Sequence, residues 1–164
     1  MVTWIKKHFR GHLERRPWGF CWRIGIESTA VSLSAAALLA LLFEVPEREF
    51  LNFSIGEAFL LLIVVAPPLE TLLLQALPIF IVRLLKGSMR IQVYVSTAVF
   101  ASLHFPEGLV TGIAAGIIGG LYFGFAYAHW RTKSRWKSFW ITTVGHSIHN
   151  AIAFLLLAVF GAWG

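Results

Sequence analysis

Long apolar stretches separated by short polar segments dominate the chain. A helix needs about 20 mostly apolar residues to cross a bilayer. Five stretches approach that length, at about 24–43, 57–83, 90–105, 108–130 and 137–161, and the third is the shortest. The pattern predicts an all-α fold, a polytopic membrane helix bundle of about five transmembrane helices.

The first 23 residues follow another pattern. Apolar Trp4, Phe9 and Leu13 alternate with lysines and arginines. No small-residue cleavage site follows a short apolar run there, as it would in a signal peptide. We therefore expect 1–23 to be a basic amphipathic segment at the membrane surface, with a single membrane domain over 24–164.

Composition and charge agree with this picture. Hydrophobic residues make up 57% of the 164 and charged residues only 13%, against about 25% charged in soluble domains. The loop at 44–56 is acidic, whereas the N-terminus and the segments at 83–90 and 131–137 are basic. A cytoplasmic N-terminus puts every basic cluster inside, so we expect a multi-pass protein of the cell (inner) membrane. The basic residues do not share one exposed face, which argues against nucleic acid as a partner.

Ionisable groups inside a membrane are costly and are candidates for function. Glu70 follows Pro67 and Pro68 in the middle of the second stretch. Because proline suits the first turn of a helix and not its interior, we expect the helix to break there and restart. Glu70 would then lie in the first turn of the new helix. The structural alternative is a glutamate that only caps a broken helix.

Three more polar residues fall at a similar depth. His104 ends the third stretch, and His146 and Asn150 lie four residues apart on one face of the fifth. At about 1.5 Å per residue, these residues and Glu70 reach one layer in the middle to outer half of the membrane. We therefore expect a single site. The alternatives are an interfacial histidine at 104 and simple hydrogen bonding between helices at 146 and 150.

Glycines recur every fourth residue along the fourth stretch. They are Gly108, Gly112, Gly116, Gly120 and Gly124. This spacing predicts a face without side chains that another helix can approach closely. A glycine-lined substrate groove is the alternative.

Glu70, Phe100-x-x-x-His104 and His146-x-x-x-Asn150 occur in this order. Together they resemble the motifs EExxxR, FxxxH and HxxxN of the CAAX protease and bacteriocin-processing family of intramembrane proteases. The resemblance covers about 57–161.

The first motif departs from the family pattern. Thr71 and Gln75 stand where the family has its second Glu and its Arg. Both replacements are neutral, so neither leaves an orphan charge. We expect a hydrogen bond between Thr71 and Gln75 to replace a supporting ion pair.

The resemblance implies a glutamate-type intramembrane endopeptidase. Glu70 and His104 would activate a water, His146 and Asn150 would form the oxyanion hole, and Phe100, Thr71, Gln75 and His149 would support them. The substrate would be a membrane-associated or lipidated protein or peptide. The short loops are typical of a prokaryotic member.

No cofactor or metal is required by this chemistry. A zinc variant is the alternative, since two histidines and a glutamate are a known catalytic ligand set, and His146 and His149 could supply both histidines. A second alternative is a non-catalytic family member, acting in bacteriocin self-immunity or as an interaction protein, which the altered first motif favours. A transporter would need inverted repeats and a polar pathway, yet residues 151–160 are entirely apolar. The sequence does not indicate an oligomeric state.

Overall fold

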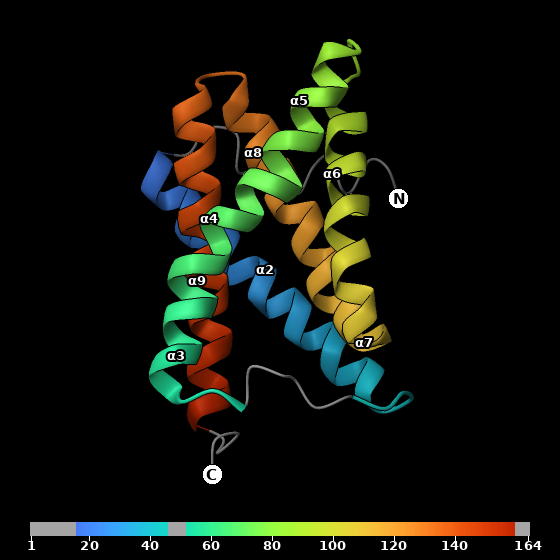
Figure 1. Ribbon diagram of the computed structural model, residues 1–164, viewed down its shortest axis with the longest axis vertical. Coiled ribbons are helices and arrows are strands. Elements are labelled where there is room, and N and C mark those ends of the chain that lie inside the picture. Colours follow the sequence, from blue (N-terminus) through green and yellow to red (C-terminus); the bar gives the residue numbers. More distant parts are fainter. Residues whose placement is uncertain (1–15, 46–51, 160–164) are drawn as a thin grey trace.

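The computed structural model describes residues 16–45 and 52–159, and these form a bundle of helices (Figure 1). Within these ranges there is no β-strand. The predicted all-α fold is confirmed. Residues 1–15, most of the predicted surface segment, lie outside the described part of the chain, and α2 already begins at Pro17.

Four helical runs in the described ranges are long and apolar enough to cross a membrane. They are α2 (Pro17–Ala40), the run Ile55–Leu84, the run Leu109–Arg131 and α9 (Arg135–Val159). The remaining long helix, α6 (Met89–His104), has 16 residues, fewer than the roughly 20 of a full span. The predicted third stretch is therefore a short member of the bundle, and five spans is an approximate count.

The two runs in the middle of the chain are built from several segments. The run Ile55–Leu84 consists of α3 (Ile55–Phe59), η2 (Leu60–Val65), α4 (Ala66–Glu70), η3 (Thr71–Ala76) and α5 (Leu77–Leu84), where η2 and η3 are π-helical. A 3₁₀ turn, η4 (Phe105–Glu107), then leads into α7 (Leu109–Thr111), the π-helical η5 (Gly112–Gly119) and α8 (Gly120–Arg131).

The expected break at Pro67 and Pro68 is wrong, because the helix continues through both prolines. The backbone N–H of Ala66 donates to the carbonyl five residues earlier, in π-helical register. In that register the next two acceptors are the carbonyls of Leu62 and Ile63, and their donors would be the missing N–H groups of the two prolines. The wide turn accommodates the proline rings and leaves two carbonyls free. Glu70 is consequently the last residue of α4 and not part of a first turn.

Two side chains of α9 bind these free carbonyls. Asn150 Nδ2 donates to the Leu62 carbonyl at 2.7 Å, and Ser147 Oγ donates to the Ile63 carbonyl at 2.9 Å. Unpaired backbone groups are costly in a bilayer, so the prolines fix where α9 docks on η2.

A similar contact joins the next segment to α6. The Leu74 carbonyl lies in the π-helical segment η3, four residues before Pro78. Ser96 Oγ of α6 donates to that carbonyl at 2.9 Å. Both helices that carry site histidines are thus attached to the proline-containing run.

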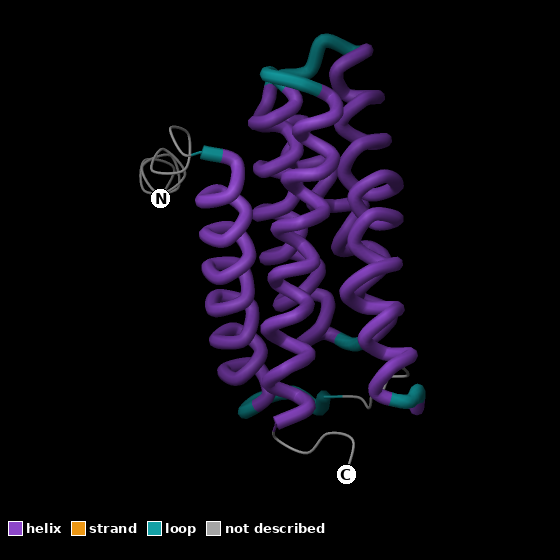
Figure 2. Tube along the Cα trace, turned by 90° about the vertical axis from the view of Figure 1, so that its left-hand side faces the viewer, coloured by secondary structure: helices purple, strands orange, loops and turns teal. Residues whose placement is uncertain are grey.

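The glycine face packs against α6, which confirms the predicted close approach and identifies the partner helix. A Cβ added at Gly116 would lie 2.9 Å from the Cα of Ala101, and one at Gly120 would lie 3.2 Å from the Cα of Thr97. Real Cβ atoms essentially never come as close as 2.9 Å, and 3.2 Å is tighter than most real Cβ contacts, so both glycines let the backbone of α6 approach closely. The first described helix, α2, lies along one side of the bundle (Figure 2). Its Thr29 hydroxyl donates to the Gly25 carbonyl at 2.7 Å and lies 3.3 Å from the carbonyl of His149 in α9.

Charge is separated between the two ends of the bundle. The α5–α6 and α8–α9 turns lie at the same end (Figure 1) and carry the described basic clusters around Arg83 and Arg135. Glu44 and Glu107 lie in the connections at the other end. This is the separation expected from the sequence, and the cytoplasmic location of the basic end remains a prediction.

Replacing Gly116 with alanine tests the glycine face. We expect Gly116→Ala to lower the free energy of unfolding by about 1–3 kcal/mol, because the new methyl group forces α6 away. Gly56→Ala is the matched control, since a Cβ there meets nothing within 4 Å. Thermal unfolding in detergent, followed by tryptophan fluorescence, measures both. Equal stability of the two variants would contradict close packing at Gly116.

A double-mutant cycle tests the docking of α9 on the proline turn. Ser147→Ala should cost about 0.5–2 kcal/mol, because it leaves the Ile63 carbonyl without a donor. Pro68→Ala restores a backbone N–H in register with that carbonyl, so Ser147→Ala should cost less in the Pro68→Ala background. The measurement is again the unfolding free energy. The same cost in both backgrounds would show that the proline does not create the acceptor.

Candidate active site

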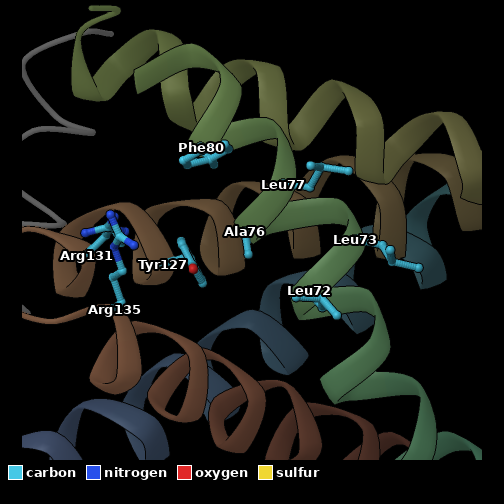
Figure 3. Close-up of a pocket in the computed structure, with 8 residues that line it drawn as sticks. All are labelled: Leu72, Leu73, Ala76, Leu77, Phe80, Tyr127, Arg131 and Arg135. Carbon is cyan, nitrogen blue, oxygen red and sulfur yellow. The ribbon is translucent and has the colours of Figure 1, made fainter. Parts of the chain in front are cut away.

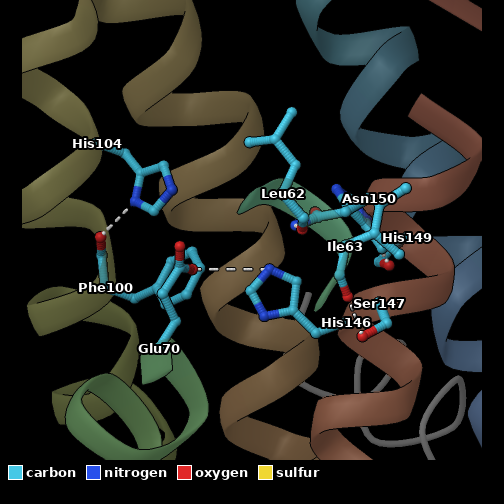
Figure 4. Close-up of polar contacts among 10 residues, drawn as sticks. Leu62, Ile63, Glu70, Phe100, His104, His146, Ser147, His149 and Asn150 are labelled. Carbon is cyan, nitrogen blue, oxygen red and sulfur yellow. Dashed lines mark hydrogen bonds and ion pairs between the residues drawn. The ribbon is translucent and has the colours of Figure 1, made fainter. Parts of the chain in front are cut away.

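The four principal residues predicted from sequence line one cavity. Glu70 comes from α4, His104 from α6, and His146 and Asn150 from α9. The cavity has a volume of about 190 Å³. Its remaining lining residues are Leu62, Ala66, Phe100, Glu107, Ala115, Phe123, His149, Ala153, Phe154 and Leu157. The side chains of Glu70, His104 and His146 point into the space between the three helices (Figure 4).

Glu70 and His146 face each other across this space. His146 Nε2 lies 3.7 Å from Glu70 Oε2, which is too long for a direct hydrogen bond. Neither this carboxylate oxygen nor His146 Nδ1 has a hydrogen-bond partner among the described residues. His146 is 3% exposed, and its ring stacks on Phe123 with centroids 4.1 Å apart. The aromatic contact thus orients an imidazole whose polar atoms are not committed to other groups.

The His104 ring is fixed by its own helix. His104 Nδ1 lies 2.8 Å from the Phe100 carbonyl one turn earlier. A carbonyl only accepts, so Nδ1 carries the hydrogen. In the neutral ring Nε2 then has a free lone pair that can accept a proton. The Phe100 ring stacks on His104 with centroids 4.5 Å apart, so Phe100 contacts the imidazole through both its ring and its carbonyl.

His149 is anchored away from Glu70. Its Nδ1 lies 2.8 Å from Ser28 Oγ of α2, and that hydroxyl also lies 3.1 Å from the Gly25 carbonyl. Ser28 donates to the carbonyl and therefore accepts from His149. No described group of three His, Cys, Asp or Glu side chains is arranged to hold a metal ion. A histidine held through Nδ1 keeps Nε2 available as a metal ligand, so the anchoring on Ser28 leaves the zinc alternative open.

The side-chain amide nitrogen of Asn150 can donate two hydrogen bonds. One N–H donates to the Leu62 carbonyl, and a primary amide nitrogen carries a second hydrogen. Asn150 also lines the cavity and is only partly buried. The second N–H is therefore free to bind an acceptor in the cavity.

Thr71 and Gln75 do not line the cavity, and both are 0% exposed. The expected hydrogen bond between them is wrong. The Thr71 hydroxyl and both polar atoms of the Gln75 amide lack hydrogen-bond partners in the described part of the chain. Two side chains without charge replaced the family's charged pair, and they did not form a new pair with each other.

Three residues at the site were missed by sequence reasoning. Glu107 lines the cavity and its charge acts on Glu70, Phe123 stacks on His146, and Ser28 binds His149. Glu107 lies three residues after His104, and that short spacing is the signal that could have found it. Phe123 and Ser28 carry no distinguishing signal among the many phenylalanines and serines of apolar helices.

The arrangement suits acid–base hydrolysis. A carboxylate and an imidazole with a free lone pair are suited to accept protons. A second imidazole and an amide N–H can stabilise negative charge that develops on a carbonyl oxygen. All four groups are positioned by helices, which hold side chains more precisely than loops do.

The family model described as type II CAAX prenyl endopeptidase Rce1-like matches residues 52–152. These residues contain the proline run, α6, and the part of α9 with His146 and Asn150. Comparison with curated proteins and with solved structures found no match. The chain therefore belongs to the type II CAAX prenyl endopeptidase Rce1-like family.

Proposed function

We propose that the chain is a glutamate-type intramembrane endopeptidase that cleaves a membrane-associated or lipidated protein or peptide. The observation that carries this proposal is the convergence of Glu70, His104, His146 and Asn150 on one cavity from three separate helices. Four costly polar groups at one place in a membrane protein indicate a functional site. Membership of the endopeptidase family supports the reaction type.

The proposed reaction starts with a water bound between Glu70 and His104. Glu70 takes a proton from this water while the oxygen attacks the carbonyl carbon of the scissile peptide bond. His104 Nε2 accepts a hydrogen bond from the water, since its Nδ1 hydrogen is committed to the Phe100 carbonyl. Glu70 then returns the proton to the leaving amine when the C–N bond breaks, so protons balance over the cycle.

The tetrahedral oxyanion is stabilised by hydrogen-bond donors of α9. His146, with its hydrogen on Nε2, and the second N–H of Asn150 are the proposed donors. One such donor is worth about 2.7–4 kcal/mol in other proteases. The aromatic contacts of Phe123 and the Leu62 carbonyl hold these groups in place before substrate binds.

We propose that this hydrolysis needs no metal. The support is chemical: a carboxylate and a neutral imidazole can activate a water by proton transfer alone, and the chelator arm of the cleavage assay separates this reaction from zinc hydrolysis. We also propose the inner membrane, with a cytoplasmic N-terminus, as the location of this multi-pass protein, because the basic turns share one end.

A non-catalytic role, in bacteriocin self-immunity or protein interaction, is the second candidate. The observation that favours it is the altered first motif, in which Thr71 and Gln75 are buried without forming a pair. The two candidates differ in whether Glu70 is needed for turnover.

Substituting Glu70 tests the proposal directly. We expect Glu70→Gln to lower the rate of peptide cleavage about 10²–10⁴-fold, because the general base is lost. The assay uses purified protein in lipid or detergent with a library of lipidated and membrane-tail peptides. Glu44→Gln is the control, since Glu44 is an exposed residue outside the cavity. A chelator should leave the wild-type rate unchanged, and loss of activity to the chelator would indicate a metalloprotease.

Asn150 needs its own control because it also anchors α9. Asn150→Ala should lower the rate about 10²–10³-fold through the lost oxyanion donor. Ser147→Ala removes the neighbouring anchor without touching the cavity, so it should retain most activity. If both variants lose the same activity, anchoring explains the effect and Asn150 is not an oxyanion donor.

Gln75 offers a test of the supporting residues. We expect Gln75→Met to raise the free energy of unfolding by about 1–3 kcal/mol, because a buried amide without partners is removed. Cleavage should fall several-fold, as is common when a costly polar residue is kept for function. Unfolding midpoints and kcat measured on the same preparation give both values. A stabilised variant with unchanged kcat would remove Gln75 from the supporting set.

A further inference from the structure

A second hollow lies near the basic end of the bundle, between the η3–α5 segment and the α8–α9 turn. It has a volume of about 340 Å³. Its lining residues are Leu72, Leu73, Ala76, Leu77, Phe80, Tyr127, Arg131 and Arg135 (Figure 3). None of them lines the cavity around Glu70. We call this hollow the arginine groove.

One wall of the arginine groove is apolar and faces the membrane. Leu72, Leu73, Leu77 and Phe80 are each about half exposed. They lie within the membrane-spanning run Ile55–Leu84, so their exposed surface contacts lipid chains. Ala76 lies among them and its small side chain leaves space. This wall fits a hydrocarbon chain.

The other wall is basic and lacks counter-charges. Arg131 ends α8 and Arg135 begins α9, and Arg131 also lies within electrostatic range of Arg83. None of the three arginines forms an ion pair with a carboxylate among the described residues. The first turn of α9 carries no acidic residue, although the positive end of a helix dipole favours negative charge there. An anion at this position would relieve the mutual repulsion of the guanidinium groups.

Tyr127 adds a polar group at the junction of the two walls. Its side chain is 7% exposed and lines the groove. Its hydroxyl makes no hydrogen bond to any residue in the described ranges. It lies one helical turn before Arg131, beside the two arginines in Figure 3. The hydroxyl oxygen is not among the buried polar atoms that lack a partner, so it is open to the groove, where an anionic oxygen can accept a hydrogen bond from it.

We propose that the arginine groove is a binding site for one anionic phospholipid of the adjacent leaflet. The phosphate binds Arg131 and Arg135, which suit bidentate recognition of phosphate oxygens, and Tyr127 donates to it. An acyl chain lies along Leu72, Leu73, Leu77 and Phe80. The position next to lipid selects this occupant, because a free anion would use only the basic wall. The proposal does not depend on peptide hydrolysis.

The bound lipid would bridge elements that carry the cavity around Glu70. Leu72 lies two residues after Glu70 in the same helical run, while Arg135 begins α9, the helix of His146 and Asn150. A ligand that contacts both walls therefore links the proline run to α9 at the basic end. A ligand that binds the folded protein and not the unfolded chain raises the free energy of unfolding.

Native mass spectrometry of the full chain in detergent tests the site. Phosphatidylglycerol is titrated against phosphatidylcholine with the same acyl chains. We expect the wild type to retain one phosphatidylglycerol in preference to phosphatidylcholine. Arg131→Ala/Arg135→Ala should weaken phosphatidylglycerol binding about 10- to 30-fold, since each arginine near a membrane surface contributes about 1 kcal/mol.

The matched control removes the same charge from the same turn. Lys133→Ala/Lys137→Ala changes two exposed residues that do not line the groove, so it should leave phosphatidylglycerol binding within about twofold of wild type. Equal loss in the two double variants would show general surface attraction and overturn the site. Equal retention of both lipids by the wild type would overturn it as well.

Two further measurements keep the result decisive. Arg135→Ala changes one exposed residue at a helix end, so it reports on the basic wall if the double variant unfolds. Ala76→Phe should fill the apolar wall and weaken phosphatidylglycerol binding while both arginines remain. If inorganic phosphate displaces the lipid equally well at equal concentration, the occupant is a free anion and the lipid assignment is wrong.

Discussion

A backbone carbonyl inside a bilayer has no water to bind, and the arrangement of this protein depends on that constraint. Pro67 and Pro68 remove two N–H donors from the middle of a membrane helix. The helix widens there into a π-helical turn that leaves the carbonyls of Leu62 and Ile63 free. Side chains of α9 donate hydrogen bonds to both carbonyls. The prolines therefore specify where another helix docks.

The same contacts bring the candidate catalytic residues of α4 and α9 together. Asn150 binds the Leu62 carbonyl and lines the cavity, while Glu70 lies at the end of the short α segment that follows the turn. Because α9 docks on these two carbonyls, His146 Nε2 lies 3.7 Å from Glu70 Oε2. A helix contact required by backbone hydrogen bonding thus sets the depth of the site.

Packing then decides how the imidazoles are oriented. The glycine face brings α6 close to η5 and α8, so that Phe100 and Phe123 contact each other beside the cavity. Each phenylalanine stacks on one histidine, Phe100 on His104 and Phe123 on His146. Rigid aromatic supports suit a site whose charged and polar groups have few hydrogen bonds of their own. The arginine groove shares no lining residue with this cavity and uses a later part of the same helical run.

Hydrophobic pattern and motif spacing were enough to predict the helices, the membrane environment and the family. Apolar stretches of nearly bilayer length predict helices from hydrophobicity alone, and the spacing of Glu70, His104, His146 and Asn150 along those helices limits their depth. The glycine spacing likewise predicts a close helix contact. All of these are properties of single segments, and they need no knowledge of neighbours beyond the bilayer.

Which side chains and backbone groups contact one another depends on how the helices pack. Whether the prolines break a helix or widen it depends on whether α9 offers donors to the free carbonyls, which no local pattern reveals. Thr71 and Gln75 have the spacing of a pair, yet both are buried without a hydrogen-bond partner in the described part of the chain. Glu107, Phe123 and Ser28 reach the site through helix packing and turn geometry. These outcomes depend on the relative rotation and height of separate helices, and one segment's sequence does not contain that information.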